Sequence, residues 1–185
     1  MSTIDNSRTF NANEVNNRYS YYCKLVEEKL KNHQKPHDRR YHQGFFIPKR
    51  PIKCMNIMEV GDIQPIVWRS SWEQKFMEWL DSNDVVTRWG SEIISIPYKD
   101  PIKGKMSIYI PDFYLEYLDN KKQLQKYLIE IKPMSQSKLS EAKDGYDRLR
   151  IAKNAYKWSQ AIVYCKKKGI TFKVMTEYDL GIKSF

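Results

Sequence analysis

The sequence predicts an α/β domain in which a mixed central sheet is flanked by helices. Three observations carry this prediction: helically spaced aromatic residues after residue 70, apolar strand patterns between residues 92 and 132, and a long basic helix followed by a short strand. The predicted order is helix, three strands, helix, strand. The 185 residues suit one compact domain with an appendage, so we expect a core domain over 67–185 and an N-terminal arm over 1–66.

The N-terminal arm is predicted to combine a helix with an extended basic segment. Tyr22, Val26 and Leu30 recur at helical spacing and predict a helix over 16–31. Between residues 29 and 53 there are eight Lys or Arg residues against one acid, and three prolines discourage helix there. This segment is interpreted either as a solvated linker or as a surface that contacts DNA or a protein partner.

The core domain is predicted to begin with a helix over 71–81. Ser70 followed by Glu73 fits a capping box, in which each side chain bonds to the backbone at the helix start. Apolar residues then recur at helical spacing: Trp72, Phe76, Trp79 and Leu80. Glu73 therefore has a structural interpretation that needs no role in catalysis.

Three strands are expected after this helix, over residues 92–98, 106–118 and 127–132. These runs are rich in Ile, Tyr and Leu, which favour strands. The polar turn at 119–122 separates the second strand from the third, so these two strands are expected to pair antiparallel.

A long helix is predicted over residues 137–168, with Gly169 just past its end. Its buried stripe is expected to contain Ile151, Ala155, Trp158 and Ile162. Residues 170–176 are predicted to form the last strand. This strand is expected to run parallel to an earlier one, because a helix crosses over to it.

Basic residues are concentrated in the second part of the long helix. Between residues 148 and 168 there are seven Lys or Arg residues and no acid. Arg150, Lys153 and Lys157 are expected to form one ridge opposite the apolar stripe and to follow a phosphate backbone. Arg69, beside the predicted first helix, is a further candidate for a phosphate contact. A solvated helix face is the alternative interpretation of the ridge.

Two carboxylates and a lysine are expected to meet where the second and third strands pair. Side chains alternate across a strand, so Glu130 and Lys132 share one face, whereas Ile129 and Ile131 share the other. Burial of the two isoleucines then directs the charged pair to the opposite side of the sheet. Asp112 lies in the preceding strand, and antiparallel pairing brings it near Glu130.

Two carboxylates beside one ammonium group are typical of a site that holds a divalent cation against a phosphodiester. We expect Asp112 and Glu130 to bind Mg²⁺ (or Mn²⁺), with the backbone carbonyl of Ile131 as a further oxygen ligand. Lys132 is expected to orient the attacking water or to stabilise charge on the phosphoryl oxygens. Glu73 is expected to complete the site, unless it only caps its helix. An ordinary salt-bridged strand face is the alternative for the three strand residues.

The composition favours nucleic acid as the partner. The formal net charge is +10, and a surface of that charge attracts polyanions. The start of the chain is polar and no apolar stretch approaches a membrane span, so we expect a protein that is neither secreted nor in a membrane. The three cysteines are expected to be reduced thiols. His33, His37 and His42 fit no familiar zinc pattern.

The motif Pro111-Asp112 followed by Glu130-Ile131-Lys132 resembles that of the PD-(D/E)XK nuclease superfamily, whose restriction-endonuclease-like core has the same order of elements. The flanking segments resemble the head-completion nucleases of tailed (T-even-like) bacteriophages and, more distantly, the DNA-end-cleaving subunit of certain bacterial transposons. These segments are residues 68–73, 110–113, 130–133 and 169–177. The resemblance covers roughly residues 44–185, and residues 1–43 have no counterpart in it.

The resemblance implies that Asp112 and Glu130 bind the metal, that Lys132 assists the attack, and that Glu73 on the first helix joins them. It implies a Mg²⁺-dependent endodeoxyribonuclease that leaves 5′-phosphate and 3′-hydroxyl ends and acts on packaged DNA late in capsid assembly. The expected location is the virion or the host cytoplasm, with the portal or neck as possible partners. Two alternatives stay open: a head or neck protein that keeps the nuclease fold mainly to bind DNA, and a DNA-cleaving subunit of a recombination or transposition complex.

Overall fold

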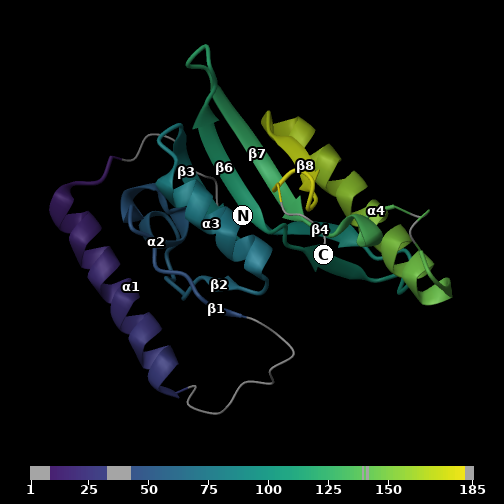
Figure 1. Cartoon of the computed structure of the whole chain (residues 1–185), viewed down its shortest axis with the longest axis horizontal. Coiled ribbons are helices and arrows are strands. Elements are labelled where there is room, and N and C mark those ends of the chain that lie inside the picture. Colours follow the sequence, from purple (N-terminus) through teal and green to yellow (C-terminus); the bar gives the residue numbers. More distant parts are fainter. Residues whose placement is uncertain (1–8, 33–42, 139, 141, 182–185) are drawn as a thin grey trace. The chain divides into compact units, whose positions relative to one another are not determined.

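The computed structural model describes residues 9–32, 43–138, 140 and 142–181. The chain divides into two compact units, Met1–Ser91 and Glu92–Phe185. Figure 1 shows the helices and strands of both. The histidines for which no zinc pattern is predicted, His33, His37 and His42, lie outside the described residues. None of the described helices is both long enough and apolar enough to cross a bilayer.

The first unit is mainly helical. Its elements are α1 (Ala12–Asn32), β1 (Gly44–Phe45), the 3₁₀ turn η1 (Pro51–Lys53), α2 (Met55–Met58), β2 (Val67–Trp68), α3 (Ser71–Ser82) and β3 (Val86–Ser91). Strands β1 and β2 pair antiparallel. The helix predicted over 16–31 is confirmed, and it begins earlier because the side chain of Asn11 accepts the N–H of Glu14 at 2.9 Å.

Helix α1 is held to the rest of the first unit by side chains that include Arg18, Tyr19 and Tyr22, and Tyr19 donates to the carbonyl of Pro48 at 2.8 Å. The Arg18 guanidinium donates to the backbone carbonyls of Ile57 and Val60, at 2.6 and 2.7 Å. These carbonyls lie at the end of α2 and just beyond it, where a helix leaves acceptors unsatisfied. The buried Tyr22 hydroxyl donates to the carbonyl of Phe46. Helix α1 is therefore packed as part of this unit.

The second unit contains a mixed sheet with a hairpin and a long helix beside it. Its elements are β4 (Ile96–Lys99), β5 (Met106–Tyr109), β6 (Phe113–Leu118), β7 (Leu124–Ile131), the 3₁₀ turn η2 (Met134–Gln136), α4 (Gly145–Lys168) and β8 (Thr171–Met175). Strands β6 and β7 pair antiparallel, and β7 and β8 pair parallel. Strands β4 and β5 form a separate antiparallel hairpin. Helix α4 packs against β8 and β4 (Figure 1). The predicted mixed α/β fold is thus confirmed.

Two of the predicted strands are wrong in their extents. The strand predicted over 106–118 is divided into β5 and β6, which pair with different partners. Pro111 lies at the break, because proline has no N–H to give to a strand ladder. The strand predicted over 92–98 begins only at Ile96, as β4, and residues 92–95 belong to no strand. Glu92 has a left-handed φ of 55°, which a strand does not accommodate.

Helix α4 begins later than predicted and ends where predicted. The Asp144 side chain accepts the N–H of Asp147 at 2.8 Å, so the helix begins at Gly145. Gly169 closes it with a left-handed φ of 65°, which glycine adopts at no steric cost.

The buried stripe of α4 is rotated from the predicted one. Ile151 is buried as expected, but Ala155 and Ile162 are exposed, and Ala161 and Cys165 are buried in their place. Because α4 packs against both β8 and β4, a second side of the helix is covered as well. A prediction from one stripe could not anticipate this second contact.

Candidate active site

The end of the β6–β7 ladder brings the two predicted carboxylates together. Phe113 pairs with Ile129 in the antiparallel register. One further step along both strands places Asp112 opposite Glu130. Both faces of β7 are covered here, since Ile129, Glu130 and Ile131 are all buried. Glu130 is only 5% exposed, so its charge depends on partners within the protein.

Lys132 supplies a positive charge to both carboxylates. Its Nζ lies 3.0 Å from Oε1 of Glu130 and 3.9 Å from Oδ2 of Asp112. The Lys132 side chain is 28% exposed and that of Asp112 is 19% exposed, so the site opens to solvent on the side of these two residues. The predicted meeting of Asp112, Glu130 and Lys132 is therefore observed in the second unit.

Hydrogen bonds fix the direction of both carboxylates. Oδ2 of Asp112 accepts the backbone N–H of Ile131 at 2.7 Å. Oε2 of Glu130 accepts the hydroxyl of Tyr109 at 2.8 Å, while Oε1 faces Lys132. Burial raises the pKa of Tyr109, and the negative charge of Glu130 raises it further. The phenol therefore keeps its proton and acts as a donor to Glu130.

These residues fit a hard divalent cation. Opposed like charges destabilise a ladder, so a place where Asp112 faces Glu130 favours an added cation. Among the described residues, no group of three or more His, Cys, Asp or Glu side chains forms a metal site. Two carboxylates suffice for Mg²⁺, which usually binds through one or two of them together with waters and substrate phosphate. Asp112 and Glu130, with the predicted Ile131 carbonyl, are the residues that would hold it.

Glu73 forms a variant of the predicted capping box, in which its carboxylate bonds to the residue before the N-cap Ser70. The Ser70 hydroxyl accepts the N–H of Glu73 at 3.1 Å and donates to Oε1 of Glu73 at 3.0 Å. Oε2 of Glu73 accepts the backbone N–H of Arg69 at 2.8 Å. The carboxylate therefore satisfies donors at the start of α3. Its predicted role in metal binding, and that of Arg69 in phosphate binding, stay predictions.

The predicted basic ridge of α4 contacts the second unit itself. Nη2 of Arg150 lies 2.7 Å from Oδ1 of Asp147, and Nζ of Lys153 lies 2.9 Å from Oδ2 of Asp100. The Lys157 ammonium lies 5.8 Å from the ring centroid of Tyr109. The expectation of a ridge opposite the apolar stripe is therefore wrong for Lys153 and Lys157, which contact the hairpin, whereas Arg150 pairs within α4. Contact of these residues with DNA stays a prediction.

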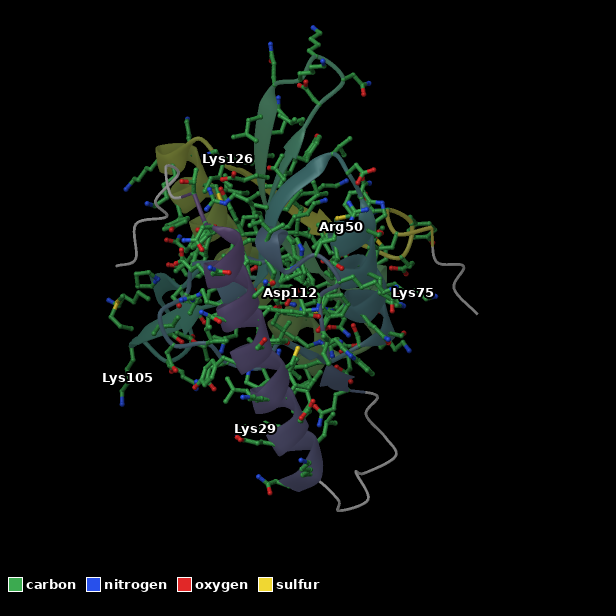
Figure 2. All side chains as sticks on the ribbon, turned by 90° about the vertical axis from the view of Figure 1, so that its left-hand side faces the viewer. Lys29, Arg50, Lys75, Lys105, Asp112 and Lys126 are labelled. Carbon is green, nitrogen blue, oxygen red and sulfur yellow. The ribbon has the colours of Figure 1, made fainter. Side chains whose placement is uncertain are left out.

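A second, similar group of side chains lies further along the same ladder. Here the hydroxyl of Tyr114 donates to Oε1 of Glu116 at 2.7 Å, and Nζ of Lys126 lies 3.5 Å from the same oxygen. Glu116 is 3% exposed and faces Lys126 in the register. We call this the Glu116 cluster, and we call Tyr109, Asp112, Glu130 and Lys132 the Glu130 cluster. Figure 2 labels Asp112 and Lys126, with Lys126 nearer the turn between β6 and β7.

Tyr109 is the member of the Glu130 cluster that the sequence patterns missed. The predicted single strand over 106–118 hides it, because in one continuous strand Tyr109 faces away from Asp112. The signal that reveals it is Pro111, since a proline inside a strand pattern indicates an edge or a break. With the strand divided there, Tyr109 ends a hairpin that can turn toward Glu130.

An α/β unit in which an aspartate, a glutamate and a lysine meet at the end of two antiparallel strands belongs to the PD-(D/E)XK class of nucleases. Residues 83–177 match the TnsA-like endonuclease N-terminal domain. The head completion nuclease of Enterobacteria phage T4 is 31% identical over 154 residues, an alignment that covers 78% of this chain and 97% of that protein. The chain belongs to the TnsA-like endonuclease family, and the resemblance seen in its motifs is confirmed.

Proposed function

We propose that this protein is a Mg²⁺-dependent DNA endonuclease (with Mn²⁺ as a substitute) that acts in phage head completion. The observation that carries the proposal is the position of Lys132 Nζ, 3.0 Å from Glu130 and 3.9 Å from Asp112. The phage head completion nuclease that aligns with 78% of the chain supports the biological role. The net charge of +10 supports DNA as the substrate.

The residues of the Glu130 cluster divide the chemistry among them. Asp112 and Glu130 would hold the metal, which supplies Lewis-acid polarisation of the phosphate and a lowered pKa of water. Lys132 places a positive charge where the phosphoryl oxygens gather negative charge. Its charge also offsets the repulsion between the two carboxylates before substrate binds. The expected products carry 5′-phosphate and 3′-hydroxyl ends.

Cleavage assays on several DNA forms test this function. The full chain is incubated with linear, nicked, branched and supercoiled DNA in Mg²⁺, in Mn²⁺ and in a chelator, beside Asp112→Asn. We expect cutting in either metal, none in chelator, and none by the folded variant. Tight DNA binding without cutting in any metal would instead support the structural head or neck role. Cutting that requires a second protein would support a recombination complex, an alternative that the TnsA-like family match favours.

A further inference from the structure

The hairpin of β4 and β5 places the hydroxyl of Tyr109 next to the carboxylate of Glu130. Tyr109 is the last residue of β5 and is 4% exposed. Its hydroxyl donates to Oε2 of Glu130 over 2.8 Å, across 21 residues of sequence. With Lys132 on Oε1, the two oxygens of Glu130 have different partners, so the plane of the carboxylate is fixed.

The hairpin that carries this hydroxyl is held against α4 by contacts that do not involve Glu130. Lys153 of α4 reaches the buried Asp100 in the hairpin at 2.9 Å. The ring of Tyr156 on α4 lies 6.2 Å from that of Tyr98 on β4, and the Lys157 ammonium lies 5.8 Å from that of Tyr109. The hairpin is thus fastened to α4 on one side, and Tyr109 reaches Glu130 from a fixed position.

A long glutamate side chain needs such a support if it is to bind a metal tightly. Three rotatable bonds separate the Glu130 carboxylate from its backbone, and fixing them on binding costs entropy. A donor already in place removes part of that cost before the metal arrives. Asp112 is shorter and is fixed by the backbone N–H of Ile131 at 2.7 Å. Glu130 is therefore the ligand for which an added partner matters most.

We propose that Tyr109 is a positioning residue, which orients Glu130 for metal binding through its hydroxyl. The inference rests on the proposed function and adds to it a residue outside the nuclease motif. Tyr109 acts through Glu130 and does not touch the metal or the DNA. Lys153, Asp100 and Lys157 support it indirectly, by holding the hairpin on α4.

The Glu116 cluster provides a matched control for the test. Tyr114→Phe removes a buried hydroxyl that donates to a buried glutamate over 2.7 Å, the same kind of bond that Tyr109→Phe removes. Both changes delete one oxygen and keep the ring, so we expect similar losses of melting temperature. Any difference between the two variants in metal affinity then reports on the position of Glu130.

Mn²⁺ affinity is measured by calorimetry on the wild-type chain and both variants, and the Mg²⁺ concentration for half-maximal DNA cleavage is measured in parallel. We expect Tyr109→Phe to weaken Mn²⁺ binding and to raise the Mg²⁺ requirement about tenfold, with partial recovery of the rate at saturating metal. Tyr114→Phe should stay within about twofold of wild type for both quantities.

Two results would overturn the inference, and they are distinguishable. If wild type binds metal and cleaves DNA, and folded Tyr109→Phe does both equally well, then Tyr109 does not position Glu130 and the proposed function stands. If wild type neither binds Mn²⁺ nor cleaves any DNA form, the proposed function fails and the role of Tyr109 fails with it.

Discussion

The Glu130 and Glu116 clusters are built from the same parts on one ladder, yet only one of them is suited to catalysis. In each cluster a buried glutamate accepts a hydrogen bond from a tyrosine hydroxyl and forms an ion pair with a lysine. The difference lies in the residue directly opposite the glutamate. Glu116 faces Lys126, whereas the next step beyond the last ladder pair places Asp112 opposite Glu130.

This difference separates a stabilising arrangement from a functional one. Opposite charges across a ladder stabilise it, so the Glu116 cluster is complete as it stands. Two opposed carboxylates repel each other, so the Glu130 cluster favours an added cation. Lys126 and Glu130 lie four residues apart on β7, about 13 Å at the usual rise of a strand. The two glutamates and their lysines therefore give separate positions for matched substitutions.

The largest expected effect comes from neutralising each glutamate in turn. Glu130→Gln removes a metal ligand, so we expect cleavage to fall by about 1,000-fold. It weakens the ion pair with Lys132 but relieves repulsion with Asp112, so we expect a smaller loss of melting temperature than in Glu116→Gln. Glu116→Gln should keep cleavage within about threefold. It weakens a buried ion pair, however, and should cost about 1–3 kcal/mol of unfolding free energy.

Cleavage rates and melting temperatures are measured for both variants, so that the effects on activity and on stability can be compared between the two clusters. Far-ultraviolet circular dichroism provides the control for folding of each variant. Loss of cleavage in Glu116→Gln, with the fold intact, would show that the two clusters are not distinct in function. Full activity of Glu130→Gln would show that the Glu130 carboxylate takes no part in cleavage.

The contrast also shows how far the sequence could predict the site. Alternation along residues 127–132 and an antiparallel partner were sufficient to bring Asp112 to Glu130 and Lys132, because both depend only on strand geometry and register. Burial of Glu130 could not be predicted in this way, because it requires that both faces of β7 be covered. Coverage of a sheet is decided by elements distant in sequence.

The other wrong predictions also concern contacts between elements that are distant in sequence. Division of residues 106–118 at Pro111 was foreseeable from local chemistry, whereas the direction taken by the hairpin was not. The helical spacing of Lys153 and Lys157 predicts a surface ridge. Their contacts with Asp100 and Tyr109 depend on the packing of α4 on the hairpin, which helical spacing does not encode. Periodicity predicts elements well and the partners of long side chains poorly.

The second largest effect is expected from the two lysines. Lys132→Ala leaves Asp112 and Glu130 without the nearby ammonium and removes a charge from the transition state, so we expect a loss of about 100-fold in cleavage. Lys126→Ala should keep cleavage within about twofold. Added Mg²⁺ should raise the melting temperature of Lys132→Ala more than that of wild type, because the ion takes over the role of the missing ammonium. Equal cleavage by the two variants would contradict the assignment of Lys132.

A smaller effect is expected from Glu73, whose two interpretations can be separated. Glu73→Gln removes the charge, but glutamine also serves in a capping box, so stability should change by less than about 0.5 kcal/mol. If Glu73 takes part in metal binding as predicted, cleavage should fall by about tenfold and the Mg²⁺ requirement should rise. Cleavage at the wild-type rate would assign Glu73 to the start of α3 alone. Ser70→Ala is the matched control, since it weakens the cap and leaves the carboxylate.

The smallest effect is a pH dependence of stability that originates in the hairpin behind Tyr109. The Lys153 ammonium, with the N–H groups of Ile102 and Lys103, lowers the pKa of Asp100 to about 2. An aspartate in the unfolded chain has a pKa near 3.9. Because the folded value is the lower one, the stabilisation is complete above about pH 4 and is lost as the pH falls toward about 2.

Asp100→Asn isolates this contribution from that of other acids. At neutral pH the variant should melt below wild type, because it loses the ion pair with Lys153. As the pH falls from about 4 to about 2, the carboxylate of wild type becomes protonated, so the two melting temperatures should converge. Asp119 lies in the turn between β6 and β7, where its carboxylate accepts backbone N–H groups, so its substitution leaves the β4–β5 hairpin intact and serves as the control. A constant difference between wild type and Asp100→Asn across this range would show that the ion pair does not hold the hairpin that carries Tyr109.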